Sequence, residues 1–223
     1  MGLSRGIFKL GVYTSIGAGE FWFFTKDSAV LPLPSNDYVA LSAHLRKYNP
    51  SNNPSVRDVC VKRVPLSSID EMLRSQDGRL VDAFCASVWG GLGYTVQRAI
   101  LAHRYERPET AHQLWTTSQL RLSTYPTGTQ VTDHFEVLEH TPTRIVFRCG
   151  DSPMKQGVRE SDGLFEISAT AKPEQGIAEF ALKSVLFQGL GTTSKSPMPS
   201  YVEWLHKQYA KLWMETALLR IQR

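Results

Sequence analysis

Residues 199–223 read PSYVEWLHKQYAKLWMETALLRIQR, and this C-terminal stretch decides the fold. Apolar side chains recur in it at helical spacing, so they would share one side of a helix. These are Val202, Leu205, Tyr209, Leu212, Trp213 and Thr216. The other side is charged, with Lys207, Lys211 and Glu215, whereas His206 lies beside the apolar stripe. The pattern predicts a long amphipathic helix that packs its apolar side on the rest of the protein.

The residues before this helix favour a series of short strands. Runs with period-two alternation or β-favouring composition are separated by turn residues, as in an antiparallel meander. The expected strands are residues 57–64, 114–123, 129–139, 144–149, 163–170 and 177–188. Helical stretches are expected at 67–74 and 80–102, and Gly90, Gly91 and Gly93 in the second indicate close packing or a break. The fold class is therefore α+β, with an antiparallel sheet followed by a long helix.

The first part of the chain has a different character. Residues 6–24 read GIFKLGVYTSIGAGEFWFF, an apolar and aromatic stretch interrupted by Lys9 and Glu20. It barely reaches the roughly 20 apolar residues that span a bilayer. Membrane association through 6–24 and a helix packed on the domain both remain open. Asn, Pro and Ser then mark a linker, so we divide the chain into an apolar segment, 1–36, and a domain, 37–223.

Composition bounds the function of these 223 residues. Hydrophobic residues make up 42% and charged residues 21%, as in ordinary globular proteins. The net charge of +4 comes without a basic run, so no nucleic-acid partner is expected. Cys60, Cys85 and Cys149 match neither a metal site nor a disulfide framework, which favours an intracellular, cytoplasmic protein. Nucleotide-binding and hydrolase motifs are absent, so no cofactor and no metal are expected.

Several phrases carry a resemblance to a known superfamily. They are DVCVKRVPLSSI before the helices, HFEVLEHTPTRIVFRCGD in the sheet, and the short runs VWGGLGY, GDSP and KLWMETAL. With the order of elements over residues 57–223, they resemble an uncharacterised, fungal-type branch of the START-like (SRPBCC) helix-grip superfamily. That superfamily includes birch-pollen-type allergens, lipid-transfer domains and aromatic polyketide cyclases. The resemblance implies a seven-stranded sheet wrapped round the terminal helix, with a cavity for apolar small molecules. It supplies no common catalytic residues, and only six strands are recognisable here.

Two places in the sequence put polar groups on apolar faces. In strand 129–139, alternation would place Asp133 on the same face as Phe135, with His134 pointing the other way. Asp133 is then a candidate general acid or base, or else the partner of an arginine such as Arg148 or Arg159. On the terminal helix, His206 and Tyr209 could polarise a carbonyl or shuttle a proton. Their alternative is a hydrogen-bonded core histidine among packed aromatic side chains.

These residues lead to a functional hypothesis. We expect a cofactor-independent cyclase or isomerase, including pericyclases such as Diels–Alderases, acting on an apolar polyketide or terpenoid intermediate. Asp133, His206 and Tyr209 would be catalytic. Substrate contacts are expected from Trp89, Tyr94, Phe135, Arg148, Phe180, Gln188 and Trp213. The alternatives are a non-catalytic carrier of an apolar ligand at a membrane, and an interaction module that binds a partner through its N-terminal segment. Convergence of the polar residues on one cavity would favour the enzyme.

Overall fold

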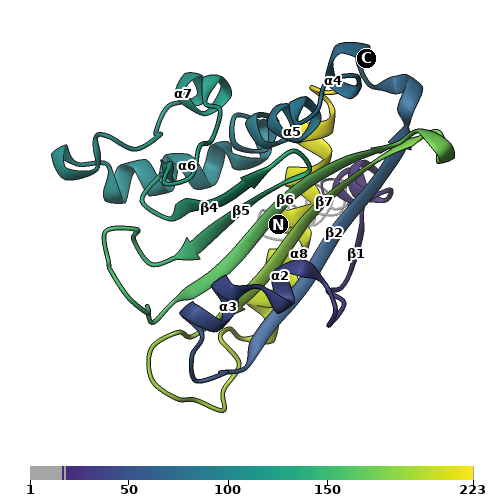
Figure 1. The fold of residues 1–223 in the computed structure, drawn as a ribbon. Helices are drawn as coiled ribbons and strands as arrows, with labels where there is room; N and C mark the ends of the chain where they lie inside the picture. Colours follow the sequence, from purple (N-terminus) through teal and green to yellow (C-terminus); the bar gives the residue numbers. More distant parts are fainter. Residues whose placement is uncertain (1–16, 18, 223) are drawn as a thin grey trace, which may run out of the picture.

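The computed structural model describes residues 17 and 19–222, and their main features are a seven-stranded antiparallel sheet and a long C-terminal helix (Figure 1). The strands lie in the order β1-β2-β7-β6-β5-β4-β3. Their bounds are β1 Ala29–Pro32, β2 Ser55–Pro65, β3 Gln130–Val131, β4 Phe135–Thr141, β5 Arg144–Gly150, β6 Asp162–Lys172 and β7 Ile177–Phe187. The helices are α2 Tyr38–Leu41, α3 Ala43–Tyr48, α4 Glu71–Arg74, α5 Arg79–Trp89, α6 Leu92–Tyr105, α7 Thr117–Leu122 and α8 Ser200–Leu218.

Alternation along the long strands gives the sheet two apolar faces, and helices cover both (Figure 1). The main core lies between the sheet and helices α5 and α8, where Phe84, Trp89 and Phe180 are fully buried. A smaller core, which includes Tyr48 and Val185, lies under α2 and α3 on the other face. Each fully buried side chain of this size contributes about 1.5–3 kcal/mol. The sheet is therefore fixed from both sides, and the space along α8 has rigid walls.

This architecture confirms the predicted fold class. The sheet has seven strands, whereas the sequence indicated six. Five of the six predicted regions contain strands, one of these regions is divided in two, and β1 is a strand that was not expected. β1 pairs with β2 from Ala29 opposite Val61 to Pro32 opposite Asp58. It lies inside the segment 1–36 that was expected to precede the domain. A four-residue edge strand that ends in proline gives little period-two signal, which explains why it was missed.

One predicted strand is wrong, because residues 114–123 contain helix α7. Thr116 caps this helix: its hydroxyl accepts the backbone N–H of Gln119, and the Gln119 side chain accepts the backbone N–H of Thr116. This reciprocal arrangement is a capping box, which satisfies donors that a helix start leaves free. Leu120 fills the buried side of the short helix. The Thr-x-x-Gln spacing of this capping box is visible in the sequence. Its effect on the backbone outweighs the β-favouring composition of the surrounding residues.

The predicted strand 129–139 is divided into β3 and β4 by a tight turn. Thr132 and Asp133 both adopt left-handed backbone conformations, with φ of 50° and 53°. Two such residues break the pairing of the strand and reset which side chains share a face. Phe135 and Val137 are buried as expected, but the orientations predicted for Asp133 and His134 are wrong.

The glycines in the predicted helix 80–102 mark both a break and a close contact. Gly90 and Gly91 separate α5 from α6. Gly93 lies against α8, where its backbone N–H donates to Thr216 Oγ1 at 3.1 Å. A Cβ atom added at Gly93 would lie 2.6 Å from that oxygen. Helices α6 and α8 therefore approach each other at a point where only glycine fits.

The N-terminal part of the described chain packs against α8. Residues 17 and 19–25 are helical, and residues 6–16 and 18 of the predicted apolar stretch lie outside the described residues. Ser28 donates a hydrogen bond to Glu215 at 2.7 Å, and Lys62 pairs with the same carboxylate at 2.5 Å. Glu215 is therefore buried, although it was expected on the exposed side of the helix. Within the described part of the chain, none of the helices has the length and apolar character needed to cross a bilayer.

Candidate functional site

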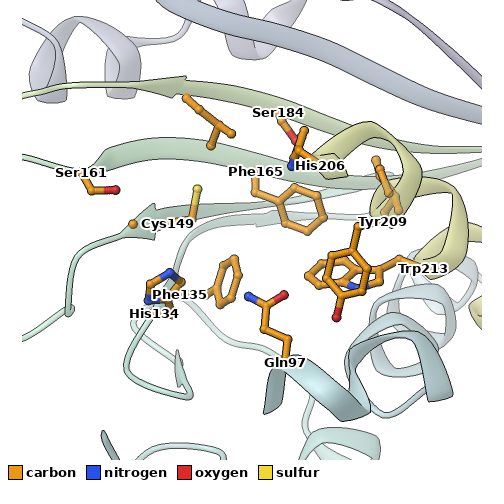
Figure 2. Close-up of a pocket in the computed structure, with 14 residues that line it drawn as sticks. Gln97, His134, Phe135, Cys149, Ser161, Phe165, Ser184, His206, Tyr209 and Trp213 are labelled. Carbon is orange, nitrogen blue, oxygen red and sulfur yellow. The ribbon is translucent and has the colours of Figure 1, made fainter. Parts of the chain in front are cut away.

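A cavity of about 240 Å³ lies between α8, α6 and the sheet. It is lined by Gln97, His134, Phe135, Cys149, Gly150, Ser161, Phe165, Leu182, Ser184, Leu186, His206, Tyr209, Ala210 and Trp213. Figure 2 shows His134 and Cys149 toward one end of the cavity and Tyr209 and Trp213 toward the other. The lining thus combines aromatic walls with a small number of polar groups. This composition is typical of small-molecule sites.

Aromatic side chains form the wall nearest to α5 and α8. The Trp89 ring lies behind this wall and contacts Phe135 at 4.6 Å and Trp213 at 5.4 Å between ring centroids. Phe165 contacts Trp213 at 5.7 Å. The pairs are tilted or edge-to-face, the arrangements that aromatic quadrupoles favour. Because these rings come from α5, α8, β4 and β6, the wall ties four elements together and keeps its shape.

His206 on α8 pairs with a carboxylate that the sequence reasoning missed. Its Nε2 atom lies 3.2 Å from Oδ2 of Asp58 on β2. Asp58 is almost completely buried, and neither of its oxygens accepts a hydrogen bond from a described residue. A buried carboxylate without donors is costly unless an opposite charge or an N–H group compensates it. Nε2 of His206 also makes no hydrogen bond, so the contact is electrostatic, and it favours the tautomer that carries the proton on Nε2.

Ser184 on β7 stands next to this pair. Its Cα is the cross-strand partner of Asp58 on one side and of Phe165 on the other. Directly opposite residues share a face, so Ser184 and Asp58 both face α8. The Ser184 side chain lines the cavity and makes no hydrogen bond to any described residue. Its hydroxyl is therefore free to bind a ligand.

His134 reaches the cavity from the opposite end. The left-handed turn at Thr132 and Asp133 directs its ring inward, where it meets Phe135 edge-to-face at 5.5 Å. Burial lowers the pKa of His134, and the nearby carboxylates of Asp133 and Asp151 oppose this shift only in part. The ring is therefore neutral near pH 7, and it can donate from one nitrogen and accept at the other.

Two further groups in the cavity wall stay protonated. Burial raises the pKa of the Cys149 thiol to about 12, so it is not a thiolate nucleophile at neutral pH. Burial also raises the pKa of Tyr209. The Tyr209 hydroxyl donates to the carbonyl of Gly93 at 2.8 Å, so its proton is used within the protein. Tyr209 consequently presents the face of its ring, rather than a free donor, to a ligand.

Four of the predicted site residues meet at this cavity: Phe135, His206, Tyr209 and Trp213. Trp89 and Tyr94 lie directly behind its aromatic wall. The two rings contact each other at 4.9 Å, and the Tyr94 hydroxyl forms a hydrogen bond with Thr132. These two residues support the cavity rather than line it.

Asp133 lies outside the cavity, and neither arginine that was considered as its partner contacts it. Its carboxylate accepts hydrogen bonds from Gln113 at 3.1 Å and from Ser152 at 2.6 Å. Its backbone N–H donates to the Gln113 side chain at 2.5 Å. These three bonds hold the turn between β3 and β4, so Asp133 shapes the site only through the direction that it gives His134.

Arg148, Phe180 and Gln188 also lie away from the cavity. Arg148 forms a buried, two-pronged ion pair with Asp162, with N–O distances of 2.9 and 2.6 Å. Phe180 packs edge-to-face on Phe84 in the main core at 4.9 Å. Gln188 donates to the carbonyl of Leu190 in the loop after β7. Strand parity placed Phe180 on the correct face of the sheet, but it could not show that this side chain lies under α5 rather than in the cavity wall.

The residues that sequence reasoning missed or misplaced are Asp58 and His134. An aspartate in the middle of a strand, on the same face as buried Cys60 and Val64, was an available signal for Asp58. For His134 the signal was weak, because few non-glycine residues adopt the left-handed conformation, although aspartate does so more often than most. Within the described residues, no three His, Cys, Asp or Glu side chains form a group that could hold a metal ion.

Comparisons with known proteins add little to this description. No protein-family model matches the chain, and no curated protein matches it either. Among solved structures, an uncharacterised protein from Rhizobium leguminosarum is similar over 75% of this chain and 96% of its own chain, with 14% sequence identity and a TM-score of 0.33.

Proposed function

We propose that this protein is a cofactor-independent isomerase or cyclase that acts on a compact apolar molecule in the cavity beside α8. The observation that carries the proposal is the pair formed by Asp58 and His206 at 3.2 Å, in the wall of a largely aromatic cavity. A histidine oriented by a buried carboxylate is a common general base. Nε2 of His206 is buried and makes no hydrogen bond to a described residue, although it lies 3.2 Å from Oδ2 of Asp58. No hydrogen bond to a described residue engages Nδ1 either. The ring is therefore not held by the saturated hydrogen bonds of a purely structural histidine.

The size of the cavity limits the substrate. A cavity of roughly 150 Å³ accepts benzene, so one of about 240 Å³ accepts a molecule of one or two rings. A long acyl chain would not be enclosed. Among apolar polyketides and terpenoids, the proposal therefore selects small cyclic or cyclising intermediates. The aromatic walls would hold such a molecule in one orientation and exclude water from the reacting atoms.

Membership of the START-like helix-grip superfamily is part of the proposal. The seven-stranded antiparallel sheet and the long C-terminal helix support it, because both were expected from that resemblance. An intracellular location fits the three free, buried cysteines.

Native mass spectrometry of the gently purified protein tests the proposal. The wild-type protein should carry a compact molecule, which Ala210→Trp should exclude because Ala210 lines the cavity. His206→Gln should retain the molecule but hold an unrearranged precursor with the same mass and a different chromatographic retention after release. Leu122→Trp, at an exposed position on α7, is the matched control for the added ring. Identical bound molecules in wild type and His206→Gln would contradict catalysis and favour a carrier.

The carrier is the second candidate, and a separate observation favours it. Trp22 and Phe23 expose 68% and 66% of their surface, and Trp204 at the start of α8 exposes 60%. Aromatic side chains of this kind are enriched where proteins meet the membrane interface. A carrier would load its ligand at such a surface. Vesicle co-sedimentation of wild type and of a Trp22→Ala, Phe23→Ala double variant checks this, and equal sedimentation of the two proteins would exclude docking through these residues.

A further inference from the structure

We infer that the substrate is an enolisable ketone, with His206 as the base that moves its proton and Ser184 as the donor to its carbonyl oxygen. The inference rests on the proposed function and names the substrate class and the roles within it. It draws on three neighbouring groups: the Asp58 carboxylate, the His206 ring and the Ser184 hydroxyl. They come from β2, α8 and β7, and the pairing of β2 with β7 brings Asp58 beside Ser184.

The His206 ring turns Nε2 toward the buried carboxylate of Asp58, at an ion-pair distance without the geometry of a hydrogen bond. The charge of Asp58 favours the tautomer with its proton on Nε2, and Nδ1 then carries the lone pair. No described residue donates a hydrogen bond to Nδ1. The ring lines the cavity and is partly exposed, so a proton taken up by Nδ1 can exchange with water.

The second step concerns the hydroxyl group of Ser184. It lines the cavity without a hydrogen-bond partner among the described residues. A free hydroxyl in a largely apolar wall is a natural donor to a ligand oxygen. As the carbonyl oxygen gains negative charge during enolisation, this hydrogen bond becomes stronger. The two groups therefore supply the base and the hydrogen-bond donor that enolisation of an H–C–C=O unit needs.

Aspartate, histidine and serine could instead suggest acyl transfer, but the sheet argues against it. A serine nucleophile needs backbone N–H groups that stabilise the oxyanion beside it. Ser184 lies in the middle of β7, which pairs with β2 on one side and with β6 on the other. The backbone donors along this strand are engaged in those two ladders. Proton transfer needs only the side chains that face the cavity, so it is the chemistry that this placement allows.

The reaction balances without a further reagent. Nδ1 of His206 takes a proton from the carbon next to the carbonyl group, and the C–H electron pair becomes a C=C bond. The π pair of the carbonyl moves onto its oxygen, which accepts the hydrogen bond from Ser184. In a ketone with a β,γ double bond the result is a dienolate, so His206 can return the proton to the γ carbon, the double bond moves to the α,β position, and the carbonyl group re-forms. Substrate and product are isomers, and nothing is oxidised or reduced.

The other titratable side chains that line the cavity are His134, Cys149 and Tyr209. Burial raises the pKa of Cys149 to about 12 and raises that of Tyr209 as well, so both remain protonated at neutral pH. His134 titrates below its usual range because of its burial. A His134→Gln variant therefore shows whether the second histidine contributes to proton transfer. Asp58 faces His206 from β2.

Deuterium exchange of 1-indanone, a two-ring ketone, tests the inference without knowledge of the natural substrate. Wild-type protein in D₂O should exchange the protons next to the carbonyl about 10²-fold faster than buffer, as general base catalysis typically does. His206→Gln should return the rate to that of buffer. Ser184→Ala should lower the rate by about 10²-fold, the usual effect of losing one oxyanion donor. His103→Gln, at an exposed position on α6, is the matched control and should leave the rate unchanged.

Asp58 is a positioning residue, and two variants test that role. Asp58→Asn keeps the size of the side chain but removes the carboxylate that orients the His206 ring, so exchange should slow while 1-indanone still binds. Asp58→Glu, which restores a carboxylate, should recover part of the rate. Equal exchange rates in wild type and Asp58→Asn would overturn the positioning role.

Binding measured in the same samples separates this inference from the proposed function. Saturation-transfer NMR should show that wild type, His206→Gln and Ser184→Ala all bind 1-indanone. Binding without exchange above the His206→Gln rate would overturn the inference and leave the cavity as a binding site. Absence of binding in wild type would also overturn it, whereas a co-purified molecule excluded by Ala210→Trp would still support the proposed function.

Discussion

Thr132 and Asp133 decide which side chain reaches the cavity. Their left-handed backbone conformations turn His134 inward and leave Asp133 with Gln113 and Ser152. Neither residue is a glycine, so the residue types indicate the turn only weakly, through the aspartate. Strand parity therefore assigned the two side chains to the wrong faces. This turn can be recognised only in the folded structure, where the side chain of Gln113 forms hydrogen bonds with Asp133.

His134 should make stability depend on pH. Burial lowers its pKa in the folded state, so the unfolded state binds the proton more readily and protonation favours unfolding. The contribution of His134 to stability is therefore complete above about pH 6.5, the ordinary pKa of histidine. It is lost as the pH falls from this value toward the lowered pKa of the folded state. Urea unfolding at pH 7.5 and pH 5 should show a smaller loss for His134→Gln than for wild type. Equal losses would contradict the account, and His103→Gln serves as the control.

Arg148 should matter for stability and not for ligand binding. Its guanidinium group pairs with buried Asp162 and lies over the Tyr48 ring at 3.7 Å, on the side of the sheet away from the cavity. Arg148→Met would leave the carboxylate without its partner, at a cost of about 3–5 kcal/mol in the free energy of unfolding. Urea unfolding measures this loss. If Arg148→Met instead bound ligand more weakly and kept its stability, Arg148 would be a substrate contact, as expected from the sequence.

At the scale of elements, the contact between α6 and α8 depends on one glycine. Gly93→Ala would place a methyl group 2.6 Å from Thr216 Oγ1 and 3.1 Å from the Trp213 backbone. Overpacking of this kind costs about 1–3 kcal/mol, and it would displace Trp213 in the cavity wall. Thermal unfolding and ligand binding should both suffer. Gly19→Ala, where the new atom meets nothing within 4 Å, should cause no loss.

The elements also show what the sequence could reveal. Strands β2, β5, β6 and β7 and helix α8 were predicted close to their observed bounds, because long alternating or helical periods survive in any packing. Helix α7 was misread, although Thr116 and Gln119 carried a capping-box signal. Strand β1 was too short to show a period. The capping box of α7 was present in the sequence but overlooked, whereas β1 was too short to be detected.

At the scale of the whole molecule, the candidate site depends on contacts between distant parts of the chain. His206, Tyr209 and Trp213 were predicted to share a buried helix face, and they do line the cavity. Asp58 was missed because it meets His206 only when β2 lies beneath α8. A strand pattern shows that a residue faces inward, but it does not show which helix residue it will meet. The pair of Asp58 and His206 therefore could not be predicted before the order of the strands was known.

The proposed function requires that the cavity beside His206 binds a compact apolar molecule. Intermolecular nuclear Overhauser effects between bound 2-naphthol and the protein would show where such a molecule lies. We expect one ligand per chain, with contacts to the rings of His206, Phe165 and Trp213, and loss of these contacts in Ala210→Trp. Contacts confined to the exposed aromatic side chains near Trp22 and Trp204, or unaffected by Ala210→Trp, would contradict it.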